Sequence, residues 1–133
     1  MYYIDSNTYI YFDKNVSQTL TAKLLSVSPD NLRIPSMVAA ELRYGAEKSA
    51  KRAYNSERLE KFLALYEIMP FDEDSSKCYA KIRADLEQRG QIIGANDLII
   101  AATVLSRDGT LITRNTSEFS RISKLRIENW YKI

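Results

Sequence analysis

Short apolar segments alternate with longer segments of helical periodicity, and this alternation constrains the fold of the chain more than any other feature. The expected strands lie at residues 2–5, 32–35, 68–71, 110–113 and 125–127. Between them, apolar residues recur three and four positions apart, which is the spacing of an amphipathic helix. Because parallel strands need long crossover connections, usually helices, the pattern predicts an α/β fold of three layers. We expect a central parallel sheet of four to five strands flanked by helices.

The chain length predicts one domain. A sequence of 133 residues is enough for one apolar core and short for two, so we expect a single domain over residues 1–133. The first residues lack the basic and apolar regions of a signal peptide. No segment approaches the roughly 20 apolar residues that cross a bilayer. These features predict a cytoplasmic protein without membrane contact.

The composition restricts the chemistry that this chain can perform. It contains no histidine and one cysteine, Cys78, which excludes a disulfide within the chain, a Cys/His zinc site and an imidazole base. Acid–base and metal chemistry must therefore use oxygen atoms, which favour hard cations such as Mg²⁺ or Mn²⁺. The net charge of +2 is too small to indicate nucleic-acid binding by itself.

Four acidic residues fall where an α/β sheet places its ligands. Asp5 closes the first expected strand, and Glu41 lies in the helix after the second. Asp97 opens the apolar helix before the fourth strand, and Glu118 follows that strand. Because loops and helix N-termini beyond the carboxyl ends of parallel strands share one crevice, we expect the four side chains to converge. Asp5, Glu41 and Asp97 are predicted to lie close enough to share a divalent cation.

Each of these acids also has a structural interpretation that the sequence leaves open. Asp5 and Asp97 stand at expected helix starts, where a carboxylate caps the helix or complements its dipole. Glu41 could be a solvated helix residue, and Glu118 an ordinary surface charge. The functional interpretation therefore rests on the joint position of the four acids.

A charged stretch follows Glu41. Residues 47–58 are expected to loosen the helix that begins near Ser36 and could form a mobile helical arm. The basic residues here could guide a phosphate backbone toward the acids, or they could form an ordinary solvated face. They are Lys48, Lys51, Arg52, Arg58 and Lys61.

Four separated segments resemble the ordered signature blocks of PIN domains. They are IDSN at 4–7, AELRYGAEKS at 40–49, GANDLIIAA at 94–102 and LITRNTSEF at 111–119. The closest likeness is to the VapC toxins of bacterial toxin–antitoxin pairs, and it extends over essentially the whole chain. The ELRYGAEKS segment is more specific to VapC toxins than to PIN domains at large.

The resemblance implies a magnesium-dependent endoribonuclease toxin, often acting on tRNA, that a VapB antitoxin neutralises. In this family the antitoxin carries the DNA-binding domain, so contact with DNA would be indirect, and homodimers are usual. The acids matching Asp5, Glu41 and Asp97 bind the catalytic metal in the family, and Asn115 with Glu118 matches a final polar–acidic pair.

Three positions depart from the commonest family pattern. Ser6 stands where threonine is commoner, and either hydroxyl can orient a neighbouring carboxylate. Arg114 stands where asparagine is common. Glu118 stands where many relatives have aspartate, and its extra methylene changes how the carboxylate reaches a metal.

From these residues we expect phosphodiester hydrolysis in which one or two Mg²⁺ ions activate a water and stabilise charge on the phosphate. Ser6 and Asn115 would hold the acidic ligands in place. Two alternatives stay open. A phosphatase or phosphotransferase would use Asp5 as a nucleophile, although such enzymes usually carry a second aspartate where this chain has Asn7. A non-catalytic PIN-like binding module would keep the fold without the chemistry.

Overall fold

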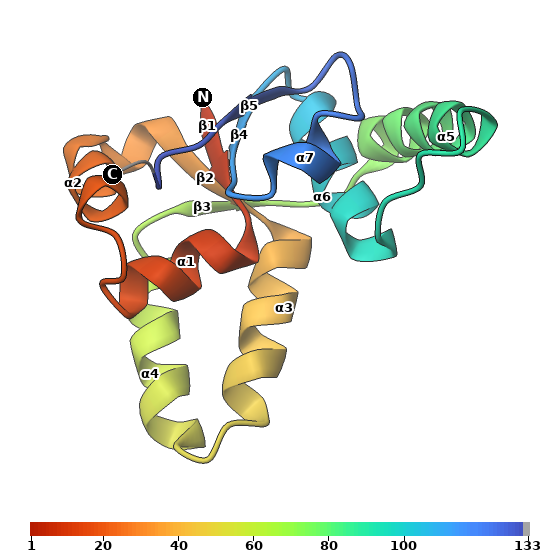
Figure 1. Ribbon diagram of the computed structural model, residues 1–133. Helices are drawn as coiled ribbons and strands as arrows, with labels where there is room; N and C mark the ends of the chain where they lie inside the picture. The colour runs from red at the N-terminus through yellow and green to blue at the C-terminus, as the bar shows by residue number, and fades with distance from the viewer. Residues whose placement is uncertain (132–133) are drawn as a thin grey trace.

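Five parallel strands form one sheet in the order β3-β2-β1-β4-β5, and helices flank it (Figure 1). The computed structural model describes residues 1–131. The strands are β1 (Tyr2–Ile4), β2 (Leu32–Pro35), β3 (Glu67–Met69), β4 (Thr110–Ile112) and β5 (Arg126–Glu128). The helices are α1 (Ser6–Asp13), α2 (Gln18–Ser26), α3 (Ser36–Glu47), α4 (Arg52–Leu63), α5 (Glu73–Gln88), α6 (Ala95–Leu105) and α7 (Thr116–Phe119), with a 3-10 turn at Pro29–Asn31. The predicted three-layer α/β fold is confirmed.

β1 and β4 lie side by side in the sheet although they are far apart in sequence. Tyr3 of β1 faces Arg33 of β2 on one side and Leu111 of β4 on the other. From β1 the chain builds outward through β2 and β3, then crosses back to β4 and continues outward to β5. The direction in which successive strands are added to the sheet thus reverses between β1 and β4. In open parallel sheets, ligands bind beyond the carboxyl ends of the strands at such a point.

The central strands form the core because their side chains are apolar on both faces. Tyr3, Ile4, Ile34, Leu111 and Ile112 are fully buried, as expected for parallel strands covered by helices on both sides. The residues that follow β1 and β4 are therefore attached to the buried centre of the sheet.

α6 is the most apolar helix, and it packs along α5. Leu98, Ile100, Ala101 and Val104 are among its buried side chains. Its N-terminus, with Asp97 in the first turn, opens toward the carboxyl ends of the strands (Figure 1). No helix within residues 1–131 combines the length and apolar character needed to cross a membrane.

α3 and α4 form a helical hairpin that extends away from the sheet (Figure 1). α3 ends at Glu47, where the chain was expected to loosen, but the expectation that it stays loose to Arg58 was wrong, because α4 already begins at Arg52. The side chain of Asn55 donates to the Ser49 hydroxyl at 2.9 Å, which ties the turn to α4. Buried Leu59 and the apolar residues after it anchor α4 against the core. Packing further along the helix thus stabilises its charged first turns.

Candidate active site

Three of the four predicted acids line one cavity beyond the carboxyl ends of β1 and β4. Asp5 directly follows β1, Glu41 lies midway along α3, and Asp97 lies in the first turn of α6. The cavity has a volume of about 140 Å³. Its walls are Asp5, Ser6, Asn7, Glu41, Asp97, Ile100, Asn115 and Phe119. Three elements far apart in sequence therefore bring carboxylates to one small space.

Asp5 is the most enclosed of these acids, with only 6% of its surface exposed. Its Oδ1 accepts hydrogen bonds from the Thr8 backbone N–H at 3.0 Å and from the Thr8 hydroxyl at 2.7 Å. The Thr113 hydroxyl donates to Oδ2 at 2.5 Å. Burial raises the pKa of Asp5 more than these hydrogen bonds lower it, and the charge of Glu41 raises it further. Asp5 therefore both caps α1 and presents a rigidly held carboxylate to the cavity.

Glu41 is held by donors from two other elements. The Ser6 hydroxyl donates to its Oε1 at 2.6 Å, and the Asn96 side chain donates to its Oε2 at 3.1 Å. Ser6 is the first residue of α1 and Asn96 the second residue of α6. The carboxylate of Glu41 thus bridges the starts of α1 and α6, next to Asp5 and Asp97.

Asp97 and Glu118 touch each other through a hydrogen bond between their carboxyl groups. Burial raises the pKa of Asp97 to about 7, and the hydrogen bond and negative charge of Glu118, with the charges of Glu41 and Asp5, add to the shift. Asp97 therefore keeps its proton to a higher pH than an exposed aspartate does, and its carboxyl group can donate to Glu118.

Glu118 lies beside the cavity, although it is not among the residues that line it. Burial opposes its ionisation, but hydrogen bonds from the Gly94 backbone N–H, the Asn115 side chain and Asp97 lower its pKa on balance. The Gly94 bond is 3.1 Å long and the Asn115 bond 2.5 Å. Of the two carboxyl groups, Glu118 is therefore the one that ionises more readily. Its contact with the cavity is indirect, by its hydrogen bond to Asp97, which lines the cavity.

Sequence reasoning missed Thr8, Thr113 and Asn96, which bond directly to the predicted acids. Thr8 follows Asp5 by three residues, which is the spacing of a side-chain helix cap and is a usable signal. Thr113 follows β4, and only the pairing of β4 with β1 brings it to Asp5. Asn96 has no comparable signal, because its contact with Glu41 depends on how α6 approaches α3.

The side chains that line this cavity include groups that could ligate a hard divalent cation. Its ligating groups are carboxylates and neutral oxygen or amide groups, which Mg²⁺ and Mn²⁺ prefer. A cation would also relieve the repulsion that raises the pKa of Asp97. Within residues 1–131, however, no three acidic or cysteine side chains are already arranged to hold one ion. To share one ion, the carboxylates would therefore have to move closer together than they lie here.

A larger groove adjoins the acidic cavity along α1, α3 and α4. It has a volume of about 640 Å³ and shares Ser6 and Glu41 with the cavity. Apolar Ile10 and Leu42 lie in its wall, and cationic Lys14 and Lys48 line it as well. A ligand in this groove would therefore extend directly to the acids.

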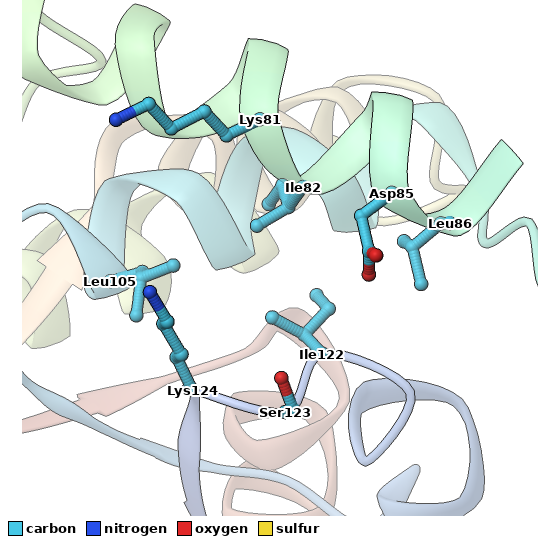
Figure 2. Close-up of a pocket in the computed structure, with 8 residues that line it drawn as sticks. All are labelled: Lys81, Ile82, Asp85, Leu86, Leu105, Ile122, Ser123 and Lys124. Atoms are coloured by element: carbon cyan, nitrogen blue, oxygen red, sulfur yellow. The ribbon is translucent and has the colours of Figure 1, made fainter. Parts of the chain in front are cut away.

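Another hollow, of about 260 Å³, lies between α5, the end of α6 and residues 122–124 (Figure 2). Lys81 and Asp85 of α5 and Lys124 carry its charges, and Ile82 and Ile122 supply apolar surface. None of the four predicted acids lines it, so it is separate from the candidate active site.

The fold and the acidic cavity define the class of this protein. Residues 2–125 match the family described as PIN domain, so the chain belongs to the PIN-domain family. The predicted likeness to VapC ribonucleases is confirmed by curated relatives of nearly the same length.

Among these relatives is Ribonuclease VapC2 of Rickettsia felis, which is 38% identical over 133 residues and covers 99% of each chain. The tRNA(fMet)-specific endonuclease VapC of Salmonella typhimurium is 33% identical, with 96% of each chain covered. Among solved structures, VapBC2 from Rickettsia felis, bound to a DNA fragment from their promoter, has a TM-score of 0.90 and 37% identity. That match covers 97% of this chain and 98% of the other.

Proposed function

We propose that this chain is a metal-dependent endoribonuclease of the VapC type whose reaction takes place at the acidic cavity. The observation that carries the proposal is the convergence of Asp5, Glu41 and Asp97, from three separate elements, on one cavity at the reversal point of the sheet. The names of the curated relatives, which are ribonucleases and endonucleases, support it.

Asp5, Asp97 and Glu41 would hold the cation. A Mg²⁺ or Mn²⁺ ion there would supply an activated water and compensate the negative charge that develops on the phosphate. Thr8 and Thr113 fix the orientation of Asp5, and Ser6 does the same for Glu41. Such hydrogen bonds to ligating carboxylates keep them oriented toward the metal.

Glu118 would act beside the cation rather than as its main ligand. Asn115 and the Gly94 N–H hold its carboxylate, which also accepts a hydrogen bond from the carboxyl group of Asp97. Binding of a cation to Asp97 would then release the proton that the two carboxylates share, so cation affinity should rise with pH.

The surroundings of Asp5 favour a nuclease over an enzyme that uses Asp5 as a nucleophile. Both oxygens of this carboxylate accept hydrogen bonds, and the side chain is almost fully buried. A nucleophile needs one oxygen free to approach the phosphorus atom in line. The surroundings of Asp5 therefore disfavour in-line attack by this carboxylate.

tRNA is the substrate class we propose, because a relative of matching length is named a tRNA(fMet)-specific endonuclease. We also propose a VapB-type antitoxin as the partner, since the similar Rickettsia felis structure is a VapBC complex. Mixing the chain with its antitoxin should abolish RNA cleavage, and undiminished cleavage by the mixture would contradict this part of the proposal. Homodimer formation stays a prediction.

The proposed activity is tested by incubating the purified chain with tRNA and with total RNA, with Mg²⁺ and with EDTA. The wild-type chain should cleave RNA only when Mg²⁺ is present. Asp5→Asn should abolish cleavage while the chain stays folded. Asp85→Asn, an exposed aspartate on α5, serves as the matched control and should cleave normally. Cleavage by Asp5→Asn at the wild-type rate, or a covalent phosphate trapped on Asp5, would refute the assignment.

A further inference from the structure

We propose that Tyr131 is a positioning residue that holds Asp5 in place through the hydroxyl group of Thr8. This inference rests on the proposed function, because it concerns the carboxylate assigned there as a metal ligand. It adds a residue more than a hundred positions from Asp5 in sequence, outside every segment that carries the family resemblance.

A chain of hydrogen bonds connects the two residues. The Tyr131 hydroxyl donates to the Thr8 hydroxyl oxygen at 2.8 Å, and the Thr8 hydroxyl lies 2.7 Å from Oδ1 of Asp5. Thr8 has no exposed surface, and Asp5 is nearly buried. Burial raises the pKa of Tyr131, so its hydroxyl remains a donor over the whole range in which the chain would work.

The hydroxyl of Thr8 has one proton and two acceptors within reach. Asp5 Oδ1 is at 2.7 Å, and the backbone carbonyl of Ile112 is at 3.1 Å. A hydrogen bond received by the Thr8 oxygen polarises its O–H group and strengthens the bond that this group donates. Donation from Tyr131 therefore favours the bond to the charged carboxylate. Without that donation, Thr8 can turn its proton to Ile112, and Asp5 loses one of its fixed donors.

Several contacts fix the position of Tyr131. Its ring packs edge-on against Tyr11, with the ring centroids 5.4 Å apart, and its backbone N–H donates to the Asn129 side chain at 2.9 Å. The preceding residue, Trp130, is buried and packs against Tyr2. The segment that carries Tyr131 is thus anchored to the sheet, so the hydroxyl is delivered to Thr8 at little further entropic cost.

Tyr131→Phe removes the hydroxyl and keeps the ring, so it tests the proposal directly. We expect kcat for RNA cleavage to fall about threefold to tenfold with an unchanged KM for RNA, because the effect on a ligating carboxylate is indirect. The matched control is Tyr11→Phe, which removes a neighbouring hydroxyl that accepts a hydrogen bond from exposed Arg114. An unchanged kcat in Tyr131→Phe, or an equal loss in Tyr11→Phe, would overturn the proposal.

A double-mutant cycle tests whether Tyr131 acts through Thr8. Thr8→Val should lower kcat by itself, and Tyr131→Phe should have no further effect in that background. An equal effect of Tyr131→Phe in both backgrounds would show a different route and overturn the proposal. An unchanged thermal midpoint in Tyr131→Phe would show that its loss of kcat does not come from unfolding.

Calorimetric titration with Mn²⁺ gives a readout that does not depend on RNA cleavage. Tyr131→Phe should bind Mn²⁺ about threefold more weakly than the wild-type chain, and Tyr11→Phe should bind it normally. If the wild-type chain binds Mn²⁺ but cleaves no RNA, the proposed function fails while the role of Tyr131 is still decided by these affinities. Equal affinities in Tyr131→Phe and the wild type, or no binding by the wild type, would overturn the role of Tyr131.

Discussion

At the scale of single residues, Asp97 and Glu118 lie in contact but have pKa values shifted in opposite directions. Burial and the neighbouring carboxylates raise the pKa of Asp97 to about 7, while donors from Gly94 and Asn115 lower that of Glu118. The two side chains differ because Glu118 accepts two hydrogen bonds from groups that cannot take the proton. The environment of each carboxylate therefore decides which one ionises.

The raised pKa of Asp97 makes stability depend on pH. The unfolded chain loses this proton near the ordinary pKa of 3.8, whereas the folded chain keeps it up to about 7. The folded state therefore binds more protons between these values, so its stability falls as pH rises through about 7. Asp97→Asn cannot ionise and can still donate to Glu118. In EDTA, it should raise the thermal midpoint most at pH 8, less at pH 5, and have little effect at pH 3, below the ordinary pKa of 3.8. The same difference between variant and wild type at all three pH values would contradict this account.

The sequence predicted the acidic residues at the site better than the groups that hold them. Asp5 and Asp97 could be found because they stand at a strand end and a helix start, and Glu41 because it lies in the helix that follows β2. These positions follow from local patterns. The Thr113 hydroxyl could not be assigned to Asp5, because its approach requires β4 to pair with β1. Strand order depends on packing of the whole chain, which local patterns do not encode.

At the scale of elements, the turn between α6 and β4 depends on a close approach at Gly109. A Cβ atom at this position would lie 2.3 Å from the ring of Tyr3, which is fully buried and cannot move aside. The absence of a side chain thus lets the end of α6 approach the central strand β1. This approach sets the position of β4, and with it Thr113.

Gly109→Ala should destabilise the fold by about 1–3 kcal/mol, because the added methyl group overpacks the core. Gly45→Ala is the matched control, since a Cβ atom there meets nothing within 4 Å. It lies within α3 and should stabilise the chain by about 0.5–1 kcal/mol. Urea denaturation of both variants measures these changes. A Gly109→Ala variant as stable as the wild type would show that the turn adapts freely.

Strand and helix positions were predicted well where periodicity and end signals coincide. The expected strand at 32–35 agrees with β2, which a proline-containing turn precedes and a serine-started helix follows. Residues 52–58 were predicted wrongly because their helical state depends on apolar contacts several residues further on in α4. α7 was not predicted, since four residues are too few to show a helical period.

At the scale of the whole molecule, free positive charge gathers at the tip of the α3–α4 hairpin. Arg52 pairs with Glu47, and Arg58 pairs with Asp13. Within residues 1–131, neither Lys48 nor exposed Lys51 forms an ion pair. The overall charge of +2 conceals this local excess. Once the hairpin has folded, Lys48 lines the groove that leads to the acids.

Replacing Lys48 and Lys51 by Ala should raise the KM for RNA and leave kcat unchanged, because these cations lie outside the acidic cavity. The slope of log KM against log salt should fall by about 0.7 for each RNA phosphate that the variant no longer neutralises. Lys77→Ala with Lys81→Ala on α5, away from the hairpin (Figure 1), is the matched control. Equal effects of the two double variants would indicate nonspecific attraction.

The central claim is that Asp5, Glu41 and Asp97 bind one divalent cation together. The most direct measurement is a crystal structure of the protein soaked in Mn²⁺, with anomalous scattering used to locate the ion. The account predicts an anomalous peak in the acidic cavity, ligated by oxygen atoms of Asp5 and Asp97 and reached by Glu41 directly or through water. No peak in this cavity at saturating Mn²⁺, or a peak that contacts neither aspartate, would contradict it.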